Sequence, residues 1–238
     1  LVKIMTDPRV YAVEPRGALR PIASEAVAAA LYGPQWAQRV DDVPEAFFFN
    51  YAVGEPLANY AALVTSLRIL TDAKLGLGYS PRRITVSTVG LVPGIEKLGH
   101  ENLRVNVAIS LHAATDEVRS KLMPVNRSFN LVALMAALKK YPLAPRQRIF
   151  FEYVMLDGVN DSPEDARQLV KLLRGLRAKI NLIPFNDWEG AQFQRPPLPR
   201  ILAFQSILID AGVTTTVRWS KGEDIGAACG QLREPIPA

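Results

Sequence analysis

The chain has 238 residues, 49% of them hydrophobic and 21% charged, which is a globular balance with enough apolar surface to bury a core. It contains no apolar run of about eighteen residues, and Leu1–Pro15 lacks the pattern of a secretory signal, so we expect no membrane partner. Lysine and arginine number 28 against 23 acidic residues, and the net charge of +5 fits either a solvated basic surface or a polyanionic partner such as RNA.

Residues 1–45 form a poorly defined N-terminal segment. They carry five prolines, and only Ser24–Tyr32 has a helical pattern. From residue 46 to residue 238 the pattern is regular, so we place the boundary between two parts of the chain at 45/46. Six apolar runs in this second part predict strands, and several are apolar enough for strands buried on both faces. The predicted strands are Ala46–Tyr51, Arg83–Thr88, Arg104–Leu111, Arg148–Met155, Lys179–Phe185 and Thr214–Arg218.

Helical patterns separate these strands. Thr115 is a predicted N-cap, Ser162-Pro163 is a predicted helix start, and Gly212 is a predicted helix stop. The predicted helices are Tyr60–Asp72, Asp116–Met123, Leu131–Tyr141, Glu164–Leu176 and Arg200–Ala211. Alternating strands and helices predict an α/β fold with parallel strands, and six strands favour a partial (β/α)6 TIM-like barrel over a full barrel of eight.

Polar residues follow the predicted strands, and in parallel barrels the working groups gather at the carboxyl ends of strands. Their coincidence at five successive strand ends favours a lined pocket. Each residue also has a structural interpretation: Glu55 as a carboxylate in a first helical turn, the serines as caps, His112 as a structural histidine and the asparagines as turn formers. The candidates are Glu55, Ser87, Ser110, His112, Asn160 and Asn186.

Cys229 is the only cysteine in the sequence. A single thiol excludes an internal disulfide and fits the reducing cytoplasm, where we expect the protein to be located. It also excludes a cysteine-ligated metal cluster built by this chain alone, because such clusters use about three or four cysteines. A lone cysteine is more often a small buried hydrophobe, but the flanking Gly226 and Gly230 favour a loop that approaches another group closely.

Seven sequence blocks stand out along the second part of the chain. They are GEPLANY (54–60), ITVSTVGLVP (84–93), AISLHA (108–113), LMPVN (122–126), FEYVMLDGVND (151–161), KINLIPFN (179–186) and DIGAACGQL (224–232). In their residues, order and spacing these blocks resemble the radical-SAM RNA methyltransferases that methylate carbon 2 of adenine. Seven blocks together make this signal stronger than one short motif.

The resemblance implies a radical-SAM barrel that binds S-adenosylmethionine and has Cys229 as the catalytic residue, which is methylated during the reaction. It implies that the substrates are 23S rRNA and tRNA, that a reductant such as flavodoxin takes part, and that the protein is a monomer. A radical step suits this substrate because adenine carbon 2 is not nucleophilic. The residues implied to bind S-adenosylmethionine are Gly54, Glu55, Ser87, Ser110, Leu111, His112 and Asn186.

The chain departs from the family at the metal cluster. The family holds a [4Fe–4S] cluster with a CxxxCxxC motif, and this sequence has no match for it, so we expect no metal ligands in this chain. Met5–Arg16 would occupy that position, and residues 1–45 would then be a remnant of the cluster-loop region. An alternative function is therefore an inactive truncated or degenerate homologue that retains only S-adenosylmethionine or RNA binding. An aldolase-like lyase is disfavoured because Lys179 begins its strand instead of ending it.

Overall fold

The computed structural model describes residues 2–4, 7–13, 19–22, 24–42, 55–74, 76–187 and 191–219. The chain divides into two compact units, Leu1–Ser66 and Leu67–Ala238. The division falls inside helix α3 (Tyr60–Thr71), and each unit is described by itself. The boundary predicted between residues 45 and 46 lies outside the described residues and stays a prediction.

The first unit contains a small sheet with the strand order β3-β2-β1-β4. Strand β1 is antiparallel to β2 and parallel to β4, and β2 is antiparallel to β3. Ser24 caps helix α1 (Glu25–Tyr32) by accepting a hydrogen bond from Val27 N, so the helical pattern seen in this segment is confirmed. The sequence did not predict this sheet. Its strands are β1 (Val2–Ile4), β2 (Asp7–Val13), β3 (Leu19–Pro21) and β4 (Asp41–Asp42).

The second unit is built on a sheet of five parallel strands in the order β5-β6-β7-β8-β9. Each strand pairs with the next one along the chain. The sheet therefore winds in one direction, as in a partial barrel, and the predicted α/β class with parallel strands is confirmed. The sixth predicted strand, Ala46–Tyr51, lies outside the described residues. The strands are β5 (Thr85–Thr88), β6 (Asn106–Ser110), β7 (Ile149–Met155), β8 (Ala178–Pro184) and β9 (Thr214–Val217).

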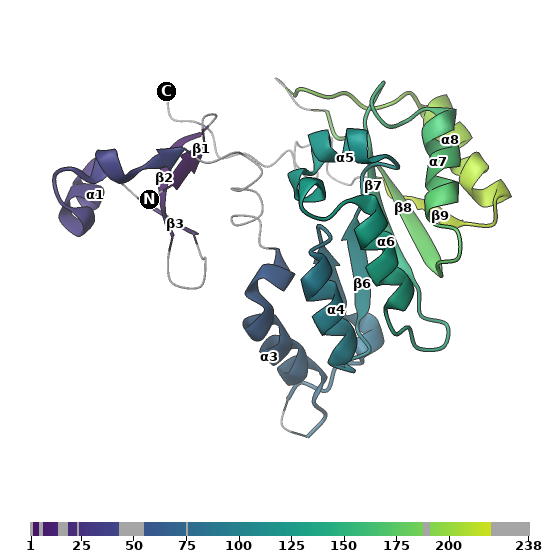
Figure 1. The fold of residues 1–238 in the computed structure, drawn as a ribbon, viewed down its shortest axis with the longest axis horizontal. Helices are drawn as coiled ribbons and strands as arrows, with labels where there is room; N and C mark the ends of the chain where they lie inside the picture. Colours follow the sequence, from purple (N-terminus) through teal and green to yellow (C-terminus); the bar gives the residue numbers. More distant parts are fainter. Residues whose placement is uncertain are drawn as a thin grey trace. The chain divides into compact units, whose positions relative to one another are not determined.

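Helices connect the strands and cover one face of this sheet. Right-handed crossovers that always step in the same direction leave their helices on the same side. Figure 1 shows α4 and α6 in front of the sheet at β6, and α7 and α8 side by side near β8 and β9. The helices are α4 (Val92–His100), α5 (Asp116–Leu122), α6 (Leu131–Lys140), α7 (Pro163–Leu172) and α8 (Leu198–Asp210).

Alternate strand residues form the core between the sheet and these helices. Phe151 and Tyr153 of β7 are fully buried, and the Tyr153 ring lies 5.4 Å from that of Phe204 on α8. The intervening residues, such as Glu152, are only partly buried and lie on the opposite face. We call this second face the inner face of the sheet. Among the described residues, no helix is long and apolar enough to cross a membrane.

The predicted helix starts and stops are confirmed where the structure describes them. Thr115 caps α5, Ser162 and Asp165 form a capping box at α7, and Gly212 follows α8 with a φ of 78°. Helix α4 was missed, because Pro93 and Gly94 look like turn residues. In the structure Pro93 occupies the first turn of α4, where its missing N–H costs nothing, and Gly94 is buried.

Candidate functional site at the strand ends

Five of the predicted site residues lie at or next to the carboxyl ends of β5, β6 and β8 in the second unit. Ser110 is the last residue of β6, Leu111 and His112 follow it directly, and Asn186 lies two residues after the end of β8. Ser87 lies one residue before the end of β5. Neither serine caps a helix, so the capping interpretation is wrong for Ser87 and Ser110. These residues reach one edge of the sheet because parallel strands all end there.

Arg119 joins the ends of β5 and β6. This arginine of α5 has no exposed surface. Its Nε donates to Leu111 O (3.1 Å), and its Nη2 donates to both Val89 O (2.7 Å) and Ser110 O (3.2 Å). Nη1 donates to Asn126 Oδ1 (2.9 Å). A planar guanidinium with five donors can serve several carbonyls at once, so Arg119 fixes the backbone on which Ser110 and Leu111 stand.

Burial lowers the pKa of Arg119 to about 10, and the nearby Asp116 opposes that shift. The side chain therefore remains charged near neutral pH. Asp116 reaches it through Asn126, whose Nδ2 donates to Asp116 Oδ1 at 2.8 Å. Gly90 allows the close approach, because its φ is +103° and an added Cβ would lie 3.3 Å from Arg119 Nη2. Neither the burial nor the role of Arg119 can be read from the sequence around it.

His112 links the end of β6 to β7. Its φ is 57°, a left-handed conformation that non-glycine residues rarely adopt. Nδ1 accepts a hydrogen bond from Val154 N at 3.1 Å, so in the neutral ring the proton is on Nε2. Burial, with a smaller contribution from Arg119, lowers the pKa of His112 to about 4. The histidine is therefore neutral at pH 7 and has one N–H to donate.

Asn160 completes the connection between these two strand ends. It is fully buried, and its Nδ2 donates to His112 O (2.8 Å) and to Val154 O (2.7 Å). Its Oδ1 accepts from Leu156 N, and its own carbonyl accepts from the Tyr153 hydroxyl, both at 2.7 Å. The turn role predicted for Asn160 is thus confirmed. The same bonds hold the strained backbone at His112 in place.

Asn186 lies on the loop after β8 and is buried. Phe185 N donates to Met155 O at 3.2 Å, which ties this loop to the end of β7. Arg195 then clamps the loop: its Nε donates to Phe185 O (2.7 Å) and its Nη2 to Asn186 Oδ1 (3.1 Å). Arg195 was not predicted, because it is brought to Asn186 only when the chain folds back after β8.

Glu55, Gly54 and Cys229 are the remaining predicted residues. Glu55 belongs to the first unit, where it is buried and its Oε1 accepts from Leu57 N at 3.1 Å. It thereby caps the 3-10 helix η2 (Pro56–Asn59), which agrees with the helix-start interpretation of this carboxylate. Gly54 and Cys229 lie outside the described residues, and their predicted roles stay predictions.

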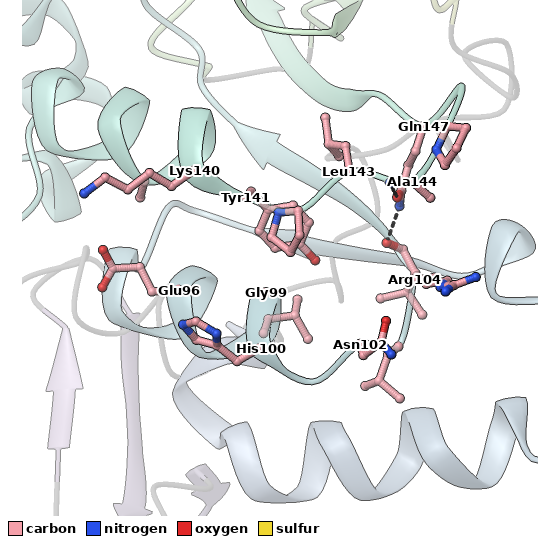
Figure 2. Close-up of a pocket in the computed structure, with 16 residues that line it drawn as sticks. Glu96, Gly99, His100, Asn102, Arg104, Lys140, Tyr141, Leu143, Ala144 and Gln147 are labelled. Atoms are coloured by element: carbon pink, nitrogen blue, oxygen red, sulfur yellow. Dashed lines mark hydrogen bonds between the residues drawn. The ribbon is translucent and has the colours of Figure 1, made fainter.

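A cavity lies elsewhere in the second unit. It measures about 790 Å³ and is lined by the ends of α4 and α6 and the segments that lead into β6 and β7, at the amino ends of these strands. Figure 2 shows Lys140 and Arg104 on opposite sides of this cavity, so its cationic side chains do not converge on one point. We therefore take the carboxyl ends of the strands, where the polar groups converge, as the candidate functional site.

Two other kinds of site find no support among the described residues. No group of three or more His, Cys, Asp or Glu side chains there could hold a metal ion. Lys179 is the second residue of β8, and its Nζ lies 5.7 Å from the centre of the Phe150 ring. A lysine at the start of a strand and stacked on an aromatic ring does not suit a Schiff base at the strand ends, which disfavours the lyase alternative.

Comparison with curated proteins identifies relatives of the chain, although no family model matches it. The dual-specificity RNA methyltransferase RlmN of Syntrophobacter fumaroxidans is 55% identical over 180 residues, which are 76% of this chain and 52% of that protein. The RlmN protein of Campylobacter jejuni is 46% identical over 202 residues, or 84% of this chain and 56% of its own length. The chain thus spans about half the length of these curated relatives.

Solved structures support the same relationship. A radical SAM methyltransferase from Sphaerobacter thermophilus matches with a TM-score of 0.70 and 49% identity, covering 76% of this chain and 52% of that one. A domain of a pyruvate-formate lyase-activating enzyme from Bacteroides vulgatus shares the fold, with a TM-score of 0.54 at 19% identity over 69% of this chain and 94% of that domain. Over the residues that it shares with these relatives, the chain belongs to the RlmN family of radical SAM methyltransferases.

Proposed function

We propose that this chain binds S-adenosylmethionine at the carboxyl ends of β5 to β8 and that it serves methylation of adenine carbon 2 in 23S rRNA and tRNA. One observation carries the proposal: a continuous hydrogen-bonded network through Arg119, His112 and Asn160 fixes the ends of β5, β6 and β7 together. Arg195 does the same for the loop of Asn186. Such buried, satisfied polar networks preorganise backbone groups and side chains to receive a ligand.

The residues in these loops suit a nucleoside with an amino-acid tail. The Ser110 hydroxyl and the neutral His112 ring supply polar contacts, and the amide of Asn186 can both donate and accept. Gly54 and Glu55 would contact the methionine end of the ligand. These groups would orient S-adenosylmethionine and exclude water from its reactive sulfonium.

Cys229 would accept the methyl group. Its thiolate attacks the methyl carbon, a bond forms to Sγ as the sulfonium carbon–sulfur bond breaks, and S-adenosylhomocysteine leaves. The thiol proton passes to solvent beforehand, because only the thiolate is the nucleophile. This displacement needs no metal. The names of the relatives support an RNA substrate, and the net charge of +5 suits a polyanionic partner. A chain with a single thiol also suits a monomer located in the reducing cytoplasm.

The [4Fe–4S] cluster that the family implies does not fit the residues of this chain. Such clusters take thiolate ligands, and the sequence contains one cysteine, Cys229. We therefore derive no step through the cluster, nor through the flavodoxin-type reductant that would serve it. The single cysteine also favours a second candidate function, in which the chain binds S-adenosylmethionine or RNA without catalysing methylation of the base.

Calorimetric titration with S-adenosylmethionine tests the binding proposal. We expect saturable binding that weakens about tenfold in Asn186→Ala, since a lost hydrogen bond typically changes affinity by this order. Gln192→Ala, which removes an exposed amide from the same loop, should bind like the unaltered chain. Absence of binding by the unaltered chain would refute the proposal.

Methyl-labelled S-adenosylmethionine separates the two candidate functions. Label on the protein that disappears in Cys229→Ala, followed by label on 23S rRNA or tRNA, supports the methyltransferase. Binding without either label supports the binding-only protein.

A further inference from the structure

Four polar residues form a row across the inner face of the parallel sheet. Ser110 on β6 lies opposite Glu152 on β7, which pairs with Asn181 on β8, and Asn181 pairs with Thr216 on β9. On each strand these side chains point away from the helices, because their neighbours in the sequence are the ones that face the core. We call these four residues the polar row.

The hydrogen bonds in the polar row run in one direction. The Thr216 hydroxyl donates to Asn181 Oδ1 at 2.7 Å, and Asn181 Nδ2 donates to Glu152 Oε1 at 2.8 Å. An ionised carboxylate can only accept, so it fixes the orientation of the Asn181 amide. Glu152 is therefore the terminal acceptor of the row.

The second carboxylate oxygen of Glu152, Oε2, accepts no hydrogen bond from the described residues. Oε2 has less than 1 Å² of exposed surface and no hydrogen-bond partner among the described residues. A buried acceptor without a donor is costly and calls for an explanation in a native structure. The Glu152 side chain as a whole is only partly buried and lies on the inner face, so a donor on a ligand bound across that face has access to this carboxylate.

The surroundings of Glu152 indicate the kind of donor. One step nearer the carboxyl ends, Val154 and Ile183 are register partners on the same face, and both are apolar and partly buried. An apolar pair suits the flat face of a base, and a carboxylate beside it suits the hydroxyls of the attached sugar. Acidic side chains that accept hydrogen bonds from ribose hydroxyls recur in nucleotide-binding α/β folds.

We propose that Glu152 Oε2 accepts a hydrogen bond from a ribose hydroxyl of S-adenosylmethionine bound across the inner face, with Asn181 and Thr216 holding the carboxylate in place. This inference rests on the proposed function, because it assumes that S-adenosylmethionine is the ligand. It adds a ligand contact that lies on the strand itself, below the loops described above.

Two ligands and three variants test this contact. The ligands are S-adenosylmethionine and its 2′,3′-dideoxyribose analogue, titrated into the full chain. Glu152→Met should weaken binding of S-adenosylmethionine at least about tenfold, as expected for a lost hydrogen bond to a charged group, and leave the analogue within about twofold. Glu152→Gln, which keeps the side-chain shape, should lose less. Thr216→Val breaks the row further from the ligand and keeps the acceptor, so it should weaken binding of S-adenosylmethionine by a smaller factor than Glu152→Met and leave the analogue within about twofold.

The outcomes distinguish the inference from the function on which it rests. If both ligands weaken equally in Glu152→Met and Glu152→Gln, Glu152 has a structural role and the inference is wrong. The inference also fails if neither variant weakens S-adenosylmethionine, while binding by the unaltered chain still upholds the proposed function. No binding of S-adenosylmethionine to the unaltered chain overturns both.

Discussion

Replacing Arg119 by methionine should destabilise the second unit and loosen the predicted binding site together. The change keeps an unbranched side chain of similar length but removes every donor. Four acceptors then lose a hydrogen bond: three backbone carbonyls at the ends of β5 and β6 and the side-chain oxygen of Asn126. The two effects should coincide because the same carbonyls shape the segment of Ser110 and Leu111.

The magnitude follows from those four lost bonds. A buried acceptor left without its donor costs about 1–3 kcal/mol, and removal of a buried charge recovers part of that sum through relief of its desolvation. We expect a loss of about 3 kcal/mol in the free energy of unfolding. For a unit of this size that corresponds to a fall in Tm of roughly 6–12 °C. Arg119→Lys should recover little, because an ammonium cannot reproduce the planar fork.

Urea unfolding followed by circular dichroism measures this loss, and Lys121→Met is the matched control on the same helix. Lys121 forms an ion pair with Glu117, and their side chains are 72% and 80% exposed, so its replacement should change stability by less than about 0.5 kcal/mol. If Arg119→Met costs no more than Lys121→Met, the reasoning about the buried guanidinium is refuted.

Three further predictions concern the same site and the metal cluster. Because the pKa of His112 is lowered to about 4, protonation below about pH 6.5 favours the unfolded chain. Between pH 7 and 4.5 the unaltered chain should lose about 2–3 kcal/mol more unfolding free energy than His112→Asn, because asparagine tolerates the left-handed backbone and does not titrate. Equal losses in the two proteins would argue against a histidine that the fold keeps neutral. Gly90→Ala should lower Tm more than Gly158→Ala, because the added Cβ would lie 3.3 Å from Arg119 and Leu134 at Gly90 and would have no neighbour within 4 Å at Gly158. The reverse order of Tm values in a melting experiment would contradict this argument from steric crowding at Gly90. Anaerobic iron–sulfur reconstitution should leave the chain with well under four irons per molecule, because Cys229 is its one cysteine; a count near four would require other ligands.

Local sequence patterns were sufficient for most elements of the second unit. Continuous apolar runs predicted β6, β7 and β8. Strands that are buried on one face and partly covered on the other contain few polar residues between their apolar ones. Capping signals at Thr115 and Ser162 marked helix starts to within a residue. Helix α4 was missed because a proline and a glycine at its start are compatible with either a turn or a first helical turn.

The predicted binding residues were found by their position after strands and by resemblance, whereas the residues that hold them in place were not. Arg119 and Arg195 look like ordinary charged residues in the sequence. Only the folded chain shows that each donates to strand-end carbonyls. The polar row was equally hidden, because Glu152, Asn181 and Thr216 belong to three separate strands.

The sequence by itself determined the class of fold, the strand ends that carry polar groups, and the family, because periodicity and motifs are local properties of the chain. It also determined the absence of the cysteines that a cluster needs. Only the tertiary structure decided which charges are buried, which acceptors are satisfied, and that Glu152 keeps one oxygen without a donor among the described residues. Burial and pairing depend on strand register and helix packing, and these bring together residues that lie tens of positions apart in the chain.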